Sequence, residues 1–138
     1  MLASLKCYNE CSMAKGKRKS KFDKARDKAH RFYFNKWRGN EKTTPAFGQK
    51  IRVTRSGWNH LINPYHKRTK AEQARRFEVL PLARKLLEEA QTFQEHRKDN
   101  FGHYFAFVGY MGGRKIKVVV RSKTFNGQKY FYSVMIAS

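Results

Sequence analysis

Hydrophobic residues recur with a helical period near the start of the chain. Residues 20–38 carry an apolar side chain at about every third or fourth position, and Lys and Arg fill many of the positions between. This spacing predicts an amphipathic basic helix that ends at Gly39 and buries an apolar stripe. The stripe consists of Phe22, Ala25, Ala29, Phe32, Tyr33 and Trp37.

A second helical pattern begins at Thr69. The tetrapeptide from Thr69 to Glu72 has the form of a capping box, in which each side chain accepts a hydrogen bond from the other residue's backbone N–H. Pro81 stands inside the pattern and is expected to kink the helix or divide it into two segments. The apolar stripe consists of Ala71, Ala74, Phe77, Leu80, Ala83, Leu86, Leu87 and Ala90.

A short strand and a short helix are predicted between these two patterns. Residues 40–49 have the turn-forming composition of a linker. Residues 50–55 alternate apolar with polar side chains, which indicates a half-buried strand. Ser56 is a suitable cap for a short helix over residues 58–62, and Asn63-Pro64 is expected to end it.

The last third of the chain has the pattern of an antiparallel meander. Strands are predicted over residues 101–111, 114–123 and 128–136. Gly112-Gly113 and Asn126-Gly127 are hairpin signals between them. We therefore predict an α+β fold, with helices packed on one face of a small antiparallel sheet and a meander at the carboxy terminus.

A two-residue turn at Gly112-Gly113 fixes which side chains share a face of the first hairpin. Pairing of Met111 with Arg114 collects apolar residues on one face, which is the face that the helices are expected to cover. The opposite face is basic with interleaved tyrosines, a combination suited to single-stranded nucleic acid. It carries Tyr104, Ala106, Val108, Tyr110, Lys115, Lys117, Val119 and Arg121.

The register of the final strand stays open at this stage. A two-residue turn at Asn126-Gly127 puts Phe131, Ser133 and Met135 on the helix-covered face, and Tyr130 and Tyr132 beside the cations. A three-residue loop with a bulge shifts the register by one and moves Ser133 to the basic face.

The charge of the chain points to a polyanionic partner. The 138 residues include 31 Lys+Arg against 10 Asp+Glu, a formal net charge of +21, and 40% are hydrophobic. Residues 1–19 are expected to form a disordered basic tail, and residues 20–138 a single domain. Nucleic acid is the commonest cellular polyanion, while an anionic membrane surface and an acidic protein are the alternatives.

Several classes of protein are disfavoured by motifs that the sequence lacks. It has no apolar run of signal-peptide or membrane-spanning length, so we expect a cytoplasmic protein without membrane contact. Cys7 and Cys11 are the only cysteines and have no nearby histidine, and no zinc, two-metal or phosphate-loop motif is present. We therefore expect neither a metal nor a cofactor.

The order of several short motifs resembles the phage-associated branch of the barnase, EndoU, colicin and RelE-like nuclease superfamily. The resemblance spans residues 50–136 and leaves residues 20–38 as an additional basic helix. Its motifs are Gly57-Trp58-x-His60, Lys67-Arg68-Thr69 with Glu72, Arg76, Leu80-Pro81-x-Ala83-Arg84, KIKVVVR and FYSV.

This resemblance implies a metal-independent endoribonuclease whose sheet binds RNA on the face opposite the helices. It also implies a toxin or phage-derived effector that acts on or near the ribosome and is paired with an acidic antitoxin or immunity protein. The matching catalytic positions are His60, Arg121, Arg68, Ser133 and Tyr132. Binding positions from the resemblance and from the hairpin register are Lys67, His66, Arg76, Tyr104, Tyr110, Lys115 and Lys117.

Metal-free RNA cleavage needs a base for the ribose 2′-hydroxyl, cations for the charged phosphate and an acid for the leaving oxygen. Histidine suits either proton transfer, so His60 is the first choice. Arg121 and Arg68 are candidates for stabilising charge, and Ser133 or, in the other register, Tyr132 for orienting the phosphate. The alternative is a non-catalytic RNA- or DNA-binding protein of the ribosome-associated or nucleoid type.

Overall fold

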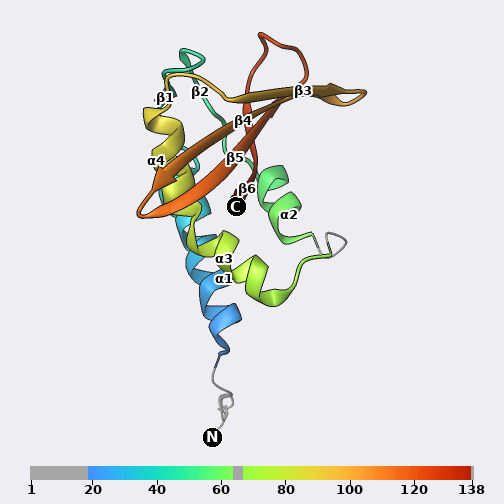
Figure 1. Ribbon diagram of the computed structural model, residues 1–138. Helices are drawn as coiled ribbons and strands as arrows, with labels where there is room; N and C mark the ends of the chain where they lie inside the picture. Colours follow the sequence, from blue (N-terminus) through green and yellow to red (C-terminus); the bar gives the residue numbers. More distant parts are fainter. Residues whose placement is uncertain (1–18, 64–66, 138) are drawn as a thin grey trace, which may run out of the picture.

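The computed structural model describes residues 19–63 and 67–137 (Figure 1). In this part of the chain, helices pack against one face of an antiparallel sheet with the strand order β3-β4-β5-β6, and β1 and β2 form a separate small hairpin. The α+β class is therefore confirmed. The elements are α1 (Lys21–Arg31), η1 (Phe32–Trp37), β1 (Thr43–Thr44), β2 (Gln49–Lys50), α2 (Arg55–Ile62), α3 (Lys70–Glu78), α4 (Leu80–Glu89), β3 (Glu95–Asp99), β4 (Gly102–Met111), β5 (Arg114–Ser122) and β6 (Tyr130–Ile136).

Two sequence predictions lie outside the described residues. The basic tail expected over residues 1–19 falls there apart from Lys19, and so does His66. No helix in the described ranges is long and apolar enough to cross a membrane.

The first helix begins where the pattern predicts. The Ser20 side chain accepts a hydrogen bond from the Asp23 N–H at 3.1 Å and caps α1. The last turns are a π-helix, η1, which the Arg38 N–H closes by donating to the Tyr33 carbonyl at 2.9 Å. Gly39 follows with a φ of 84°, so the chain leaves the helix at the predicted residue.

The strand predicted over residues 50–55 is reduced to a single bridge. Ile51 and Val53 are buried as the alternation requires. However, Arg52 alone of this stretch bridges the main sheet, where its N–H donates to Lys129 O and its carbonyl accepts from the Phe131 N–H, both at 2.9 Å. The segment is extended, but it does not form a full strand of the sheet because α2 begins three residues after Arg52.

The predicted cap of the short helix was wrong by two residues. Thr54, rather than Ser56, precedes the first helical residue, and its side chain accepts from the Gly57 N–H at 3.4 Å. Both threonine and serine are common N-cap residues, so two candidates separated by one residue left the helix start ambiguous.

The second helical pattern divides at proline as expected. The capping box of Thr69 and Glu72 is formed in both directions, at 3.1 and 3.0 Å. Helix α3 ends at Glu78, and α4 starts at Leu80 with Pro81 in its first turn, where a missing N–H costs nothing.

The first hairpin has the predicted register. Met111 pairs with Arg114, and Gly112 and Gly113 have φ angles of 58° and 78°, as a primed turn requires. The meander, however, has a preceding strand that the sequence did not predict. Strand β3, with the sequence EHRKD, is wholly exposed and pairs with β4.

The final strand combines the two registers considered above. A loop of residues 123–129 replaces the tight turn predicted at Asn126-Gly127. Phe131 pairs with Val120 on the core side, whereas Ser133 pairs with Val119, so Tyr132 is the extra residue of a β-bulge. Ser133 therefore reaches the basic face without Phe131 leaving the core.

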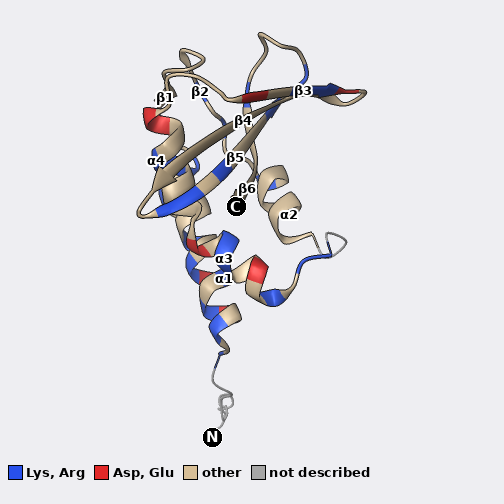
Figure 2. Ribbon diagram, in the orientation of Figure 1, with Lys and Arg blue, Asp and Glu red and all other residues tan. Residues whose placement is uncertain are grey.

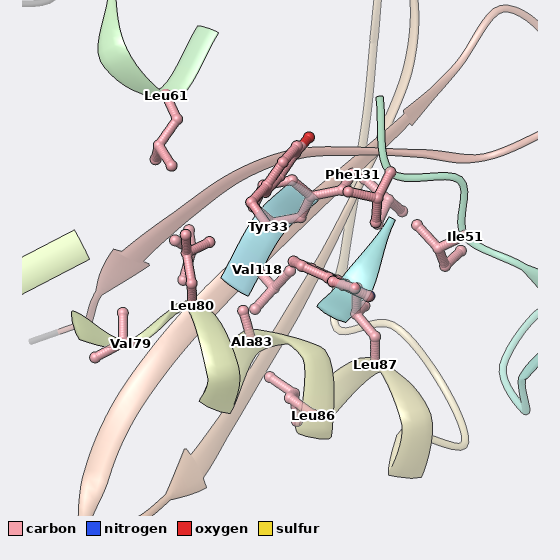
Figure 3. Close-up of a cluster of buried hydrophobic side chains, with 14 of the residues drawn as sticks. Tyr33, Ile51, Leu61, Val79, Leu80, Ala83, Leu86, Leu87, Val118 and Phe131 are labelled. Carbon is pink, nitrogen blue, oxygen red and sulfur yellow. The ribbon is translucent and has the colours of Figure 1, made fainter. Parts of the chain in front are cut away.

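The core lies between the helices and the sheet (Figure 3). Residues of α4 such as Leu80, Ala83 and Leu87 meet Val118 of β5 and Tyr33 of η1 there. The apolar side chains of the sheet face predicted to be covered are buried, which confirms the side on which the helices pack. The buried residues of this face include Phe105, Phe107, Ile116, Val118 and Val120.

Candidate active site

A pocket of about 480 Å³ lies where α2 meets the ends of β5 and β6. Figure 1 shows α2 beside β6, at the margin of the sheet. Residues far apart in sequence meet here because α2 packs against the bulged strand β6. The lining residues are Thr54, Ser56, Gly57, His60, Arg121, Ser122, Lys123, Tyr130, Phe131 and Tyr132.

Helix α2 is held tightly against the sheet at Gly57. A Cβ atom at this position would lie 2.5 Å from Tyr33 Oη and 2.8 Å from the Phe131 carbonyl oxygen. The Tyr33 hydroxyl also donates to Thr54 O at 2.5 Å, and burial raises the pKa of this phenol. The absence of a side chain at Gly57 thus sets how closely the helix approaches β6.

His60 and Tyr132 are in direct contact. His60 lies in the last turn of α2, and its ring stacks on that of Tyr132 with centroids 3.9 Å apart and planes 28° apart. Tyr132 in turn packs edge-on against Tyr104, at 5.3 Å. The bulge therefore supplies the ring that positions His60.

Arg121 is directed toward the same pocket by two contacts. Its Nη2 donates to the Phe101 carbonyl at 2.8 Å, and its guanidinium lies 5.9 Å from the Tyr104 ring centroid. Arg121 Nε is buried and has no hydrogen-bond acceptor among the described residues.

The pocket is electropositive. Its lining includes Arg121 and Lys123 and contains no Asp or Glu. Thr54, Ser56 and Gly57 belong to the cap and first turn of α2, where backbone N–H groups carry partial positive charge. Figure 2 shows Lys and Arg spread over the helices and the sheet, with acidic segments at the end of α4 and in β3. A phosphate suits this environment better than an uncharged ligand.

Two predicted arginines instead hold elements together. Arg68 Nη1 donates to Leu61 O at 3.0 Å and to Gln73 Oε1 at 3.2 Å, so it ties the end of α2 to α3. Arg76 Nη1 donates to Val134 O at 3.0 Å, between α3 and β6. Burial lowers the pKa of both guanidinium groups. Neither residue lines the pocket.

The remaining predicted residues are spread over the sheet and its surroundings. Ser133 is buried beside the bulge and does not line the pocket. Lys117 forms an ion pair with Glu95 of β3 at 2.9 Å, and the exposed Lys67 stands in the segment before α3. Tyr110 and Lys115 pair near the Gly112-Gly113 turn, at the opposite end of the hairpin from Arg121.

Sequence reasoning missed several lining residues. Tyr130 was placed on the basic face in one register but was not chosen as a site residue. Lys123 sits in the β5–β6 loop and resembles any other surface lysine in the sequence. The motif Gly57-Trp58-x-His60 was the one available signal for the first turn of α2, since its glycine stands where the helix touches β6.

The described residues contain no cluster suited to a metal ion. None of these residues forms a group of three or more His, Cys, Asp or Glu side chains that could hold an ion. His96 and His103 do lie together, with Nε2 and Nδ1 2.8 Å apart, on the helix side of the sheet, and neither lines the pocket.

A protein-family model matches most of the chain. The model of a family described as large polyvalent protein-associated domain 3 matches residues 20–132, which include the first helix, the pocket-lining residues and the first three residues of β6. No curated protein and no solved structure matches the chain significantly.

Proposed function

The chain belongs to the large polyvalent protein-associated domain 3 family, and we propose that it is a metal-independent endoribonuclease. One observation carries the proposal: His60, Tyr132 and Arg121 meet in a single electropositive pocket. A proton-transfer group beside a fixed guanidinium supplies two of the parts that metal-free phosphodiester cleavage uses. The family description itself names no activity.

The proposed reaction is an attack by the ribose 2′-hydroxyl on the adjacent phosphorus. A base takes the hydroxyl proton, the bond to the 5′-oxygen breaks, and an acid protonates the leaving oxygen. His60 acts as the general acid or base, because histidine ordinarily exchanges protons near neutral pH. Tyr132 fixes the orientation of the His60 ring by stacking on it, with the two ring centroids 3.9 Å apart.

Arg121 stabilises the negative charge that builds on the phosphate. Its contacts with Phe101 O and the Tyr104 ring fix the guanidinium in advance, and the residue lines the pocket where the phosphate would lie. Groups that need no reorganisation during the reaction stabilise a transition state most effectively. Lys123 and the first turn of α2 add positive potential at the same place.

The proposal also covers the detailed arrangement of the fold and the role of the protein as a toxin or phage-derived effector. We infer a barnase- or RelE-like arrangement in which RNA lies on the sheet face that the helices leave open, and the pocket at the margin of that face supports it. A toxin or phage-derived effector that acts on ribosome-bound RNA would have an acidic neutralising partner, and the formal net charge of +21 favours such a partner.

Cleavage of a defined substrate tests the proposal. Purified protein is incubated in EDTA with an end-labelled oligonucleotide that contains ribonucleotides, and separately with its all-deoxy counterpart. We expect cleavage of the first alone, leaving 2′,3′-cyclic phosphate and 5′-hydroxyl ends. His60→Ala should reduce the rate by about 10²–10⁴-fold, the usual contribution of general acid–base catalysis.

The matched control is His103→Ala, which removes a histidine from the other face of the sheet. Equal rates for the wild type and His60→Ala would exclude the catalytic role of His60. If tight binding occurs without any product, the protein is instead a non-catalytic nucleic-acid-binding module.

A further inference from the structure

The strand register aligns four residues across the whole sheet at its pocket end. Arg97 of β3 pairs with Tyr104 of β4, Tyr104 pairs with Arg121 of β5, and Arg121 pairs with Tyr130 of β6. Directly paired residues project from the same side of a sheet. The four side chains therefore form a cross-strand row, Arg-Tyr-Arg-Tyr, on the face that the helices leave open.

Tyr104 separates the two arginines of the cross-strand row. The guanidinium carbons of Arg97 and Arg121 lie 4.7 Å and 5.9 Å from the centroid of its ring. The ring is 8% exposed, whereas Tyr130, at the far end of the row, is 41% exposed. Tyr104 thus packs between two cations, and Tyr130 offers an open aromatic surface.

The two arginines of the row have no ion-pair partner in the described part of the chain, although the Asp99 carboxylate interacts with the Tyr104 side chain. Lys117, farther along the same face, is by contrast paired with Glu95 at 2.9 Å. Asp99 shares this end of the sheet, but its Oδ1 accepts from the Phe101 and Gly102 N–H groups at 2.8 and 3.2 Å. Two like charges beside one ring favour an anionic ligand.

We propose that the cross-strand row is a binding track for single-stranded RNA that runs across the strands. Arg121 binds the RNA phosphate at the pocket, and Arg97 binds another phosphate farther along the RNA strand. Tyr130 stacks on an unpaired base. The inference rests on the proposed function and adds a nucleotide subsite on β3, outside the pocket. Duplex RNA is a poor ligand for it, because paired bases cannot stack on Tyr130.

Lys98 provides a matched control for Arg97. It carries the same charge and is the next residue of β3, but it pairs with His103 and so projects from the other face of the sheet. Both side chains are exposed, so replacing either one by alanine is expected to leave the fold intact.

Binding is measured by fluorescence anisotropy with a labelled, fully 2′-O-methylated ten-nucleotide single strand, which cannot be cleaved by 2′-hydroxyl attack. Arg97→Ala should weaken binding about fivefold and lower the slope of log affinity against log salt by about one, whereas Lys98→Ala changes affinity less than about twofold. Tyr130→Ala should weaken binding about tenfold, the effect of losing one stacked base. A duplex of the same sequence should bind more weakly than the single strand.

Equal losses in Arg97→Ala and Lys98→Ala, or equal affinity for single strand and duplex, would overturn the track. The nuclease proposal is judged separately, by cleavage of a ribonucleotide substrate by the wild type and His60→Ala. Loss of cleavage in His60→Ala with normal binding by Arg97→Ala would refute the track alone. Weak binding by Arg97→Ala with no cleavage by any protein would refute the nuclease alone.

Discussion

The open face of the sheet has two ends with similar residues and different surroundings. At the pocket end, Arg121 and Tyr104 are paired, and α2 and the bulge at Tyr132 rise beside them. At the turn end, Lys115 and Tyr110 are paired, and Tyr110 is 75% exposed. A cation beside a tyrosine on a strand is thus not enough to make a site. The difference comes from a second element that fixes the cation and encloses space around it.

Arginine replacement at the two ends should give the largest difference. We expect Arg121→Ala to lower the cleavage rate by about 10²–10³-fold, since it removes a fixed donor from the proposed charge-stabilising position. Arg114→Ala, on the same strand at the turn end, removes an equal charge and only a 3.8 Å ion pair with Glu78, so its rate should stay within about twofold of wild type. Single-turnover kinetics measure both, and equal rates would remove the functional distinction between the ends.

Replacing one glycine by alanine near the pocket end and another at the turn end compares the cost of a steric clash with the cost of backbone strain. Gly57→Ala should lower the free energy of unfolding by about 3 kcal/mol, because the new Cβ meets Tyr33 Oη and a backbone carbonyl. Gly113 has no atom within 4 Å of the corresponding position, so Gly113→Ala costs only the strain of a φ of 78°, about 1 kcal/mol. Urea denaturation followed by circular dichroism gives both values. A Gly57→Ala protein as stable as wild type would show that α2 does not rest on β6 as described.

Removal of a tyrosine hydroxyl should have a smaller effect. Tyr33→Phe keeps the buried ring but loses the hydrogen bond to Thr54 O, and should cost about 1 kcal/mol. Thr54 O still accepts from the Trp58 N–H at 3.3 Å, which limits the loss. Tyr110→Phe, at the exposed turn end, is expected to leave the urea midpoint unchanged. Equal midpoints for the two variants would argue against the role of Tyr33 in fixing α2.

The pH dependence of stability should show the smallest effect. Burial, followed by His96, Lys98 and Lys129, lowers the pKa of His103 from its ordinary 6.5, so the folded protein binds this proton less readily than the unfolded chain. Stability is therefore lost as the pH falls through 6.5 toward the lower pKa of the folded state. Urea midpoints measured from pH 7.5 to 5.5 should fall further in wild type than in His103→Gln. Parallel curves would rule out this contribution.

Local patterns in the sequence predicted much of the fold. The capping box at Thr69, the division at Pro81 and the Gly112-Gly113 turn each depend on residues close together in the chain, and each was found as predicted. Strand β3 was missed because its sequence, EHRKD, has no apolar alternation. It is an edge strand with every residue exposed, so pairing with β4 rather than burial defines it.

The candidate site depended more on long-range geometry. His60, Arg121 and Tyr132 were chosen from the sequence, and all three line the pocket. Arg68 and Arg76 were chosen by the same reasoning, yet both bind backbone carbonyls of neighbouring elements. A basic residue that reaches a phosphate and one that reaches a carbonyl look alike in sequence. The packing of α2 and α3 decides which of the two contacts a basic residue makes. No local sequence pattern predicts this packing.

The bulge at Tyr132 also affects how this protein can vary. In a regular strand, adjacent residues alternate between core and surface, so a change of register would disturb both faces together. Tyr132 is the extra residue between Phe131 and Ser133, and it occupies no position in the core. Its exchange can therefore alter the pocket while Phe131 and Val134 keep their packing. The protein thus holds, in the middle of a structural strand, a position where new specificity can arise at little cost to stability.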